Sequence, residues 1–158
     1  MNMTLEEQLV HRLIDLNLYI SCAESCTGGM LAARIVNVAN ASKVLKVSFV
    51  TYAEESKQTF CHVSASTLSE YGVVSEAVAG EMAKGVSDTS GAEVGVGITG
   101  IAGPGGGTKE IPVGTVCFGY FIQGKLITET MHFEHCSRNE VRAAATEHAL
   151  RTLISHLH

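Results

Sequence analysis

The sequence predicts one α/β domain in which a mixed β-sheet carries helices on both faces. Three observations support this prediction. Segments of strand type alternate with helical segments in the first part of the chain, consecutive strands then follow as a hairpin, and a helix comes last. A length of 158 residues suits one domain with its own core, so we expect residues 1–158 to form a single domain.

The first half of the chain begins with a helix. Thr4 and Glu7 have the spacing of a capping box, and leucines at helical intervals follow, which predicts a helix from about Leu5 to Leu16. Short apolar or β-branched runs then alternate with segments of helical character. The predicted elements that follow are a strand at 18–23, a helix at 28–38, a strand at 45–52 and helical turns at 54–60.

Turn and capping signals divide the second half. Gly91 is placed to end a helix, and Gln123-Gly124 marks a hairpin. Ser137 and Glu140 form a second capping box ahead of the last helix. Glycines inside the strand 93–100 indicate that other backbone packs closely against it. The predicted elements are helices at 64–72 and 76–90, strands at 93–100, 114–123 and 125–134, and a final helix after Ser137.

Composition excludes several classes of protein. Apolar residues make up 46% of the chain, which argues against disorder, and a formal net charge of −5 argues against nucleic acid as a partner. The N-terminus lacks a basic segment followed by an apolar one, and no apolar run is long enough to span a bilayer. The five cysteines are scattered, as expected for free thiols. We therefore expect a cytoplasmic protein that does not bind membranes.

Two glycine-rich loops each follow a predicted strand directly. They are "AESCTGG", residues 23–29, and "TGIAGPGGGT", residues 99–108. Ligands of open α/β sheets bind beyond the carboxyl ends of strands, and loops with little side-chain bulk let backbone N–H groups converge on an anion. A helix N-terminus after such a loop adds its dipole. We predict one anion-binding site at this edge; the alternative is that the glycines only form tight turns.

The first loop offers Ser25, Cys26 and Thr27 as nucleophiles. A serine needs a base, and Lys57 lies five residues past Tyr52, just beyond a predicted strand. A lysine in a partly desolvated pocket has a lowered pKa and can act as that base, and Tyr52 can position or relay the proton. The alternative is that Lys57 is a solvated helix lysine. Cys26 is the rival nucleophile, although the spacing supplies no histidine for it.

Two arginines occupy the start of the last helix. Arg138 and Arg142 lie four residues apart, on one face, where arginine opposes the helix dipole. A bound phosphate or carboxylate would explain them, and pairing with Glu140 or Glu147 is the alternative.

A metal cluster is suggested by His132, Glu134, His135 and Cys136, which are close together in the sequence. On a strand, however, His135 points away from the other two, and further ligands at organised spacing are missing. We therefore expect no metal site.

Five segments carry a family resemblance. In order they are "AESCTGG", "VTYAEESK", "YGVVSEAVAGEMAKG", "GITGIAGPGGGTKEIPVGTV" and "SRNEVRAAATEHAL". Together they resemble the C-terminal domain of the CinA (competence-damage) family, whose stand-alone form resembles nicotinamide-nucleotide amidohydrolase. The resemblance covers the chain from about Leu5 to its end.

The resemblance implies a three-layer α/β/α sandwich that hydrolyses the carboxamide of nicotinamide mononucleotide, a small phosphorylated nucleotide, to nicotinate mononucleotide and ammonia. It implies neither metal nor cofactor, and it implies a homo-oligomer. By motif, Ser25 matches the nucleophile, and Tyr52 and Lys57 match the accompanying tyrosine–lysine element. The implied substrate-binding residues are Thr27, Gly28, Gly29, Thr99, Gly100, Ala102, Gly103, Gly105 and Arg138.

The chain departs from the family in one segment. The family usually has "YSNEAK" where this chain has "YAEESK", so that Ala53 and Glu54 replace a serine and an asparagine. A carboxylate near Lys57 raises the pKa of the lysine and favours its charged form. The alternative function is therefore a nucleotide-binding module with little or no catalysis.

Overall fold

A five-stranded mixed sheet forms the centre of the computed structural model, which describes residues 2–158. The strand order is β2-β1-β3-β4-β5. β1 pairs in parallel with β2 and β3, whereas β3–β4 and β4–β5 are antiparallel, which confirms the predicted mixed sheet. The strands are β1 (Ile20–Glu24), β2 (Leu45–Val50), β3 (Val94–Gly100), β4 (Thr115–Ile122) and β5 (Lys125–His132).

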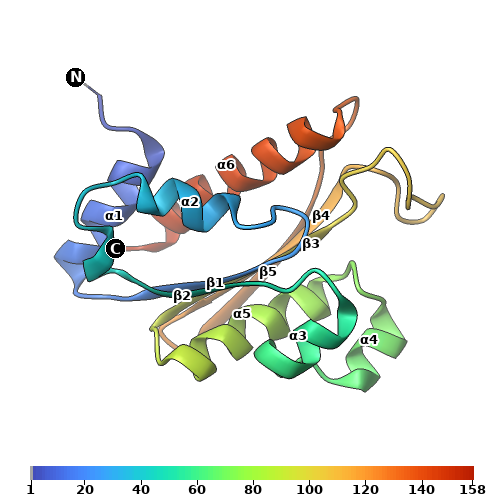
Figure 1. Ribbon diagram of the computed structural model, residues 1–158, viewed down its shortest axis with the longest axis horizontal. Coiled ribbons are helices and arrows are strands. Elements are labelled where there is room, and N and C mark those ends of the chain that lie inside the picture. Colours follow the sequence, from blue (N-terminus) through green and yellow to red (C-terminus); the bar gives the residue numbers. More distant parts are fainter. Residues whose placement is uncertain (1) are drawn as a thin grey trace.

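Helices cover both faces of this sheet, which confirms the three-layer α/β/α sandwich (Figure 1). One layer contains α1 (Leu5–Leu16), α2 (Met30–Val36) and α6 (Arg138–His156). The other contains α3 (Glu54–Cys61), α4 (Ala65–Tyr71) and α5 (Glu76–Ser90). A 3₁₀ turn (Ala41–Lys43) precedes β2. Each layer buries its own apolar cluster against the sheet, and the larger cluster lies under α1, α2 and α6.

Several element ends differ from the prediction for local reasons. β1 begins at Ile20 rather than at residue 18, because the Leu18 N–H still closes the end of α1 on the Leu13 carbonyl. Gly28 and Gly29 have φ values of 58° and 100°, so α2 begins only at Met30. β2 ends at Val50, which leaves the next two backbone carbonyls available to other partners.

α5 packs so closely on the sheet that the strand beneath it requires glycine. A Cβ at Gly95 would lie 2.1 Å from the Ala83 carbonyl oxygen, and one at Gly97 would lie 2.2 Å from that of Ala79. The interpretation of these strand glycines as points of close backbone approach is therefore confirmed. This packing fixes β3, whose carboxyl end carries the second glycine-rich loop.

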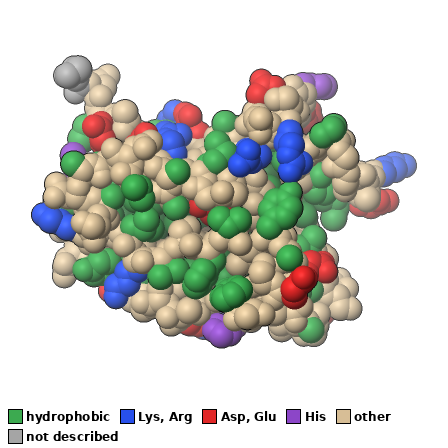
Figure 2. All heavy atoms as spheres, in the orientation of Figure 1, with side chains coloured by type: hydrophobic (Ala, Val, Ile, Leu, Met, Phe, Trp, Pro, Cys, Tyr) green, Lys and Arg blue, Asp and Glu red, His purple; other side chains and the backbone are tan. Residues whose placement is uncertain are grey.

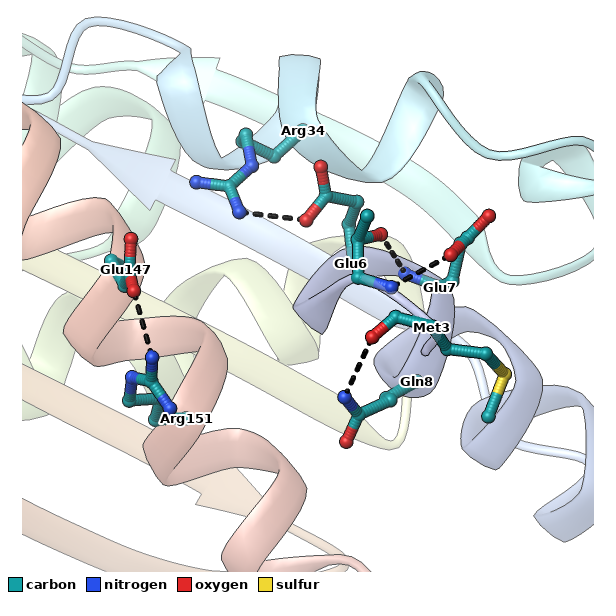
Figure 3. A network of polar contacts seen from close by, with 8 residues as sticks. Met3, Glu6, Glu7, Gln8, Arg34, Glu147 and Arg151 are labelled. Carbon is teal, nitrogen blue, oxygen red and sulfur yellow. Dashed lines mark hydrogen bonds and ion pairs between the residues drawn. The ribbon is translucent and has the colours of Figure 1, made fainter. Parts of the chain in front are cut away.

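Ion pairs and caps tie the opposite helical layer together (Figure 3). Arg34 of α2 pairs with Glu6 of α1 at 2.6 Å, and Arg151 pairs with Glu147 within α6 at 2.9 Å. Both predicted capping boxes are present at the starts of α1 and α6. Arg34, Glu147 and Arg151 border a polar surface hollow of about 900 Å³, where Arg12 also donates to the Leu157 carbonyl. The Arg34–Glu6 pair thus links α2 to α1, whereas the Arg151–Glu147 pair lies within α6.

β2 forms one edge of the sheet. On the face of the molecule that Figure 2 shows, apolar side chains gather along the middle. The large exposed apolar residues of β2, α2 and α3 include Val50, Val36 and Phe60. Tyr52, which follows β2, is also exposed, with 62% of its surface accessible. The apolar edge therefore extends toward the carboxyl ends of the parallel strands.

Candidate active site

A serine and a lysine meet at the carboxyl ends of β1 and β2. Ser25 follows β1 directly, and Lys57 lies within α3, which begins soon after β2. Lys57 Nζ is 3.1 Å from Ser25 Oγ. Lys57 is fully buried and Ser25 is 8% exposed, so the alternative of a solvated helix lysine is wrong. The structure thus brings together the predicted nucleophile and base.

The surroundings of Lys57 suit a neutral amine. Besides Ser25 Oγ, its Nζ lies within hydrogen-bond distance of the backbone carbonyls of Thr51 and Tyr52. Carbonyls only accept hydrogen bonds. The same contacts accommodate an ammonium, which donates to both carbonyls and to Ser25 Oγ, and a neutral amine, which donates to the carbonyls and turns its lone pair to the Ser25 hydroxyl. Burial lowers the pKa of Lys57, and Cys61, Glu54 and Cys26 oppose this shift only in part.

Tyr52 contacts the pair through its backbone and not through its ring. Its carbonyl accepts from Lys57 at 3.3 Å, whereas its hydroxyl accepts from Arg138 Nη2 at 2.9 Å. The Ser25–Lys57 contact is direct, so the expected proton relay through the Tyr52 hydroxyl is wrong. The Tyr52 hydroxyl instead holds the Arg138 side chain in place at the cleft by a hydrogen bond.

Cys26 is packed away from solvent, with 6% of its surface accessible. Burial raises the pKa of its thiol to about 11, and the charge of Arg142 offsets this shift only partly. A thiol in this state is a poor nucleophile near neutral pH. Its environment therefore fits a packing role beside Ser25.

A cleft of about 330 Å³ opens over the Ser25–Lys57 pair. Its walls come from both glycine-rich loops, from α3 and α6, and from the segment before α5. The lining residues are Ser25, Cys26, Tyr52, Glu54, Lys57, Val73, Val74, Thr99, Gly100, Ala102 and Arg138. Of the predicted substrate-binding residues, the cleft lining thus includes Thr99, Gly100, Ala102 and Arg138.

The other predicted substrate-binding residues lie outside this lining: Thr27, Gly28, Gly29, Gly103 and Gly105. Gly103 contributes indirectly, because its carbonyl accepts from Arg138 Nη1 at 2.7 Å and so orients that side chain. Thr99 Oγ1 donates to the Val73 carbonyl at 2.9 Å, which ties the end of β3 to the segment before α5.

The start of α2 holds a carboxylate of the chain itself. Glu24 is fully buried and accepts from the N–H groups of Leu31 at 2.9 Å and Ala32 at 3.0 Å. The prediction that this helix N-terminus offers its dipole to a bound anion is therefore wrong, because Glu24 occupies it. One feature of the sequence could have predicted this cap: Glu24 is an acidic residue at the end of a strand, shortly before a helix that begins after two glycines.

The Arg142 side chain contacts the first glycine-rich loop. Its Nε donates to the Cys26 carbonyl at 2.9 Å and its Nη2 to the Thr27 carbonyl at 3.2 Å. Glu140 caps the start of α6, and Glu147 pairs with Arg151. The ion-pairing interpretation of Arg142 is wrong, and its contact with the loop carbonyls was not predicted from the sequence.

The histidine-rich segment does not converge on one point. His132 Nδ1 lies 3.3 Å from Thr115 Oγ1, and Cys136 Sγ donates to the Glu134 carbonyl. Within residues 2–158, no three His, Cys, Asp or Glu residues are grouped so as to hold a metal ion. The same part of the chain contains no helix with the length and apolar character needed to cross a membrane.

The fold and the site define an α/β/α domain that buries a serine–lysine pair at the carboxyl ends of its parallel strands. The chain belongs to the CinA C-terminal domain family, whose sequence model matches residues 2–157. A CinA-like protein of Kosmotoga olearia is 45% identical over 147 residues, which is 93% of this chain and 35% of that protein. The chain spans between 35% and 38% of the length of the first curated relatives it matches.

Solved structures share the fold over their whole length. A competence or damage-inducible protein of Enterobacter asburiae is 34% identical, with a TM-score of 0.94, and the match covers 99% of this chain and 100% of that one. The competence/damage inducible protein CihA of Agrobacterium tumefaciens is 38% identical, with a TM-score of 0.89 and 98% coverage of both chains.

Proposed function

We propose that this protein hydrolyses the carboxamide of nicotinamide mononucleotide to nicotinate mononucleotide and ammonia. One observation carries the proposal: the buried amine of Lys57, with its lowered pKa, lies 3.1 Å from the hydroxyl of Ser25. A module that only binds a nucleotide does not need a base against a hydroxyl. A serine nucleophile does need one.

The chemistry follows from this contact. Ser25 Oγ attacks the carboxamide carbon while its proton passes to Lys57 Nζ, and the resulting ammonium then protonates the amide nitrogen, which leaves as ammonia when the C–N bond breaks. Water next attacks the acyl group with Lys57 again as base, which releases the carboxylate and restores Ser25. The backbone N–H group of Thr27 donates to no acceptor within the part of the chain that is described. It is a candidate donor to the oxyanion, worth about 3–4 kcal/mol in comparable hydrolases.

The cleft also suits a phosphorylated nucleotide. Its volume of about 330 Å³ is within the usual range for a small-molecule site. Arg138 lies at its edge, where the guanidinium can engage two phosphate oxygens at once. Gly100 and Ala102 add little side-chain bulk. The phosphate is therefore proposed to bind at Arg138, with the carboxamide at Ser25.

The departure from the family pattern is compatible with this activity. Ala53 and Glu54 are both exposed, and the partners of Lys57 besides Ser25 are backbone carbonyls, which do not depend on those side chains. Glu54 raises the pKa of Lys57, but burial is the larger influence and the net shift is downward. Lys57 therefore keeps the properties of a base.

Release of ammonia from nicotinamide mononucleotide by the purified protein tests the proposal, beside Ser25→Ala and Lys57→Ala. We expect both variants to lose activity, while isothermal titration calorimetry still detects binding of the nucleotide to them. A wild type no faster than the variants would contradict catalysis. Binding without turnover would favour the alternative, a nucleotide-binding module, which the charge of Glu54 at the cleft would then help to explain.

A further inference from the structure

We propose that Arg142 is a positioning residue, which orients the peptide between Cys26 and Thr27 so that its N–H is ready for the oxyanion. The inference rests on the proposed function and adds to it a role for a residue outside the cleft lining. Arg142 belongs to α6, and its guanidinium contacts Cys26 in the first glycine-rich loop, 116 positions earlier in the chain.

All three guanidinium nitrogens of Arg142 are engaged by oxygens of the protein. Nε and Nη2 hold the carbonyls of Cys26 and Thr27, and Nη1 donates to Asn139 Oδ1 at 3.0 Å. A Cβ at Gly28 would come within 3.2 Å of Nη2, so the glycine leaves room for the guanidinium. The planar guanidinium therefore fixes the directions of two successive carbonyls. The single ammonium group of a lysine would orient them less well.

The geometry of the peptide bond carries this orientation across to the N–H. In a trans peptide the carbonyl and the following N–H point in opposite directions. Because the Cys26 carbonyl faces Arg142, the Thr27 N–H faces away from it. That N–H donates to no acceptor in residues 2–158. Thr27 is fully buried and does not line the cleft, but its N–H is left unused by protein groups and lies one residue beyond Cys26, which does line it.

The charge of Arg142 strengthens the same donor. A carbonyl that accepts from a cation polarises its peptide and makes the attached N–H a better donor. The charge lies directly against this loop, since Nε and Nη2 donate to the carbonyls of Cys26 and Thr27. Arg142 therefore acts on the donor by orientation and by polarisation. It contributes more where negative charge develops, that is, in the transition state.

Kinetics of Arg142→Lys and Arg142→Ala on nicotinamide mononucleotide test this role, with Arg151→Ala as the control on an exposed turn of α6. We expect kcat to fall about ten- to a hundred-fold in Arg142→Ala and less in Arg142→Lys, with KM nearly unchanged, because the lost interaction acts on the transition state. Added guanidinium ion should restore part of the kcat of Arg142→Ala. A rise in KM with unchanged kcat would overturn the proposal and make Arg142 a ligand of the substrate.

Labelling of Ser25 by an organophosphate tests the role of Arg142 independently of whether nicotinamide mononucleotide is the substrate. Diisopropyl fluorophosphate phosphorylates an activated serine: the Ser25 O–P bond forms, the P–F bond breaks, fluoride leaves and Lys57 takes the proton. Intact-mass measurement should show labelling in the wild type, none in Ser25→Ala, and labelling slowed at least ten-fold in Arg142→Ala.

A labelled wild type that leaves nicotinamide mononucleotide intact would refute the proposed substrate and keep the role of Arg142. Equal labelling rates in the wild type and Arg142→Ala would overturn that role. A wild type in which Ser25 is not labelled would overturn it too, since there would be no prepared donor to orient. Equal thermal unfolding of Arg142→Lys and the wild type excludes a loss of fold as the cause.

Discussion

Lys57 Nζ lies 3.1 Å from Ser25 Oγ although 32 positions separate the two residues in the chain. The contact arises because β1 and β2 are parallel neighbours, so Ser25 after β1 and α3 after β2 meet at the same edge of the sheet. Parallel pairing places the ends of both strands together, and the short segment after β2 then returns the lysine to the serine. The fold thereby makes a buried lysine part of its core.

Replacing Lys57 separates activity from stability. Lys57→Met should lower the rate of ammonia release by about 10²-fold or more, because the base is removed. The pKa of Lys57 is lowered from its ordinary value of 10.5, so the folded protein disfavours the ammonium form. The resulting penalty on the free energy of unfolding is largest at low pH and disappears as the pH rises past 10.5.

Thermal unfolding at several pH values checks this. We expect the Tm of Lys57→Met, relative to wild type, to be highest at low pH and to fall as the pH rises toward 10.5, with each kcal/mol equal to about 2–4 °C. A Tm difference that does not vary with pH would show that burial has not shifted the pKa of Lys57.

The pH dependence of the rate should respond to Glu54. The active form contains neutral Lys57, so kcat/KM should rise with pH and level off above the pKa of the lysine. Glu54 raises that pKa, and its removal in Glu54→Gln should therefore move the midpoint of the rise to lower pH. The shift should be small, because Glu54 is exposed and screened by salt. Glu55→Gln is the matched control, and a shift to higher pH would contradict the assignment.

Cys26 should be inert and dispensable. With its pKa raised to about 11, only about one thiol in a thousand is ionised at pH 8, so alkylation by iodoacetamide should be slow. Mass mapping of the native protein should find Cys136, which is partly exposed, modified first. Cys26→Ala should retain most of the rate. Near-total loss of activity in that variant would transfer the nucleophile from Ser25 to Cys26.

Glu24 should matter for stability. Glu24→Gln replaces an oxygen acceptor with an amide nitrogen against the N–H groups of Leu31 and Ala32, and a buried donor left unsatisfied costs about 1–3 kcal/mol. Urea unfolding should report this loss. Glu147→Gln, which breaks an exposed pair with Arg151, should change the free energy of unfolding by less than about 1 kcal/mol. Equal effects of the two changes would contradict the capping role of Glu24.

The contact between α5 and the sheet should tolerate no side chain at its closest point. In Gly97→Ala the new Cβ would lie 2.2 Å from the Ala79 carbonyl oxygen and 2.8 Å from the Ala83 nitrogen, so α5 would have to move. We expect a loss of about 4 kcal/mol or more, or failure to accumulate folded protein. Gly105→Ala is the control, since a Cβ there meets nothing within 4 Å and should leave the Tm unchanged.

The sequence was sufficient to predict the layers and the serine–lysine pair. Local signals such as the cap at Thr4 are encoded within a few residues, and Ser25 and Lys57 each lie in a recognisable motif after a strand. Glu24 and Arg142 were misjudged because their partners are backbone groups, which leave no trace in residue types. The contact of Arg142 also depends on how α6 lies over the first loop, and no local pattern specifies that.

The main-chain acceptors around Lys57 have a consequence for how this segment can diverge. The carbonyls of Thr51 and Tyr52 are the same whatever side chains follow them, so the lysine keeps these two acceptors while positions 53 and 54 vary. A charge at position 54 alters the pKa of the amine, but burial remains the larger influence. Relatives that differ from one another between the tyrosine and the lysine should therefore be compared by the backbone conformation of that turn and not by its residue types.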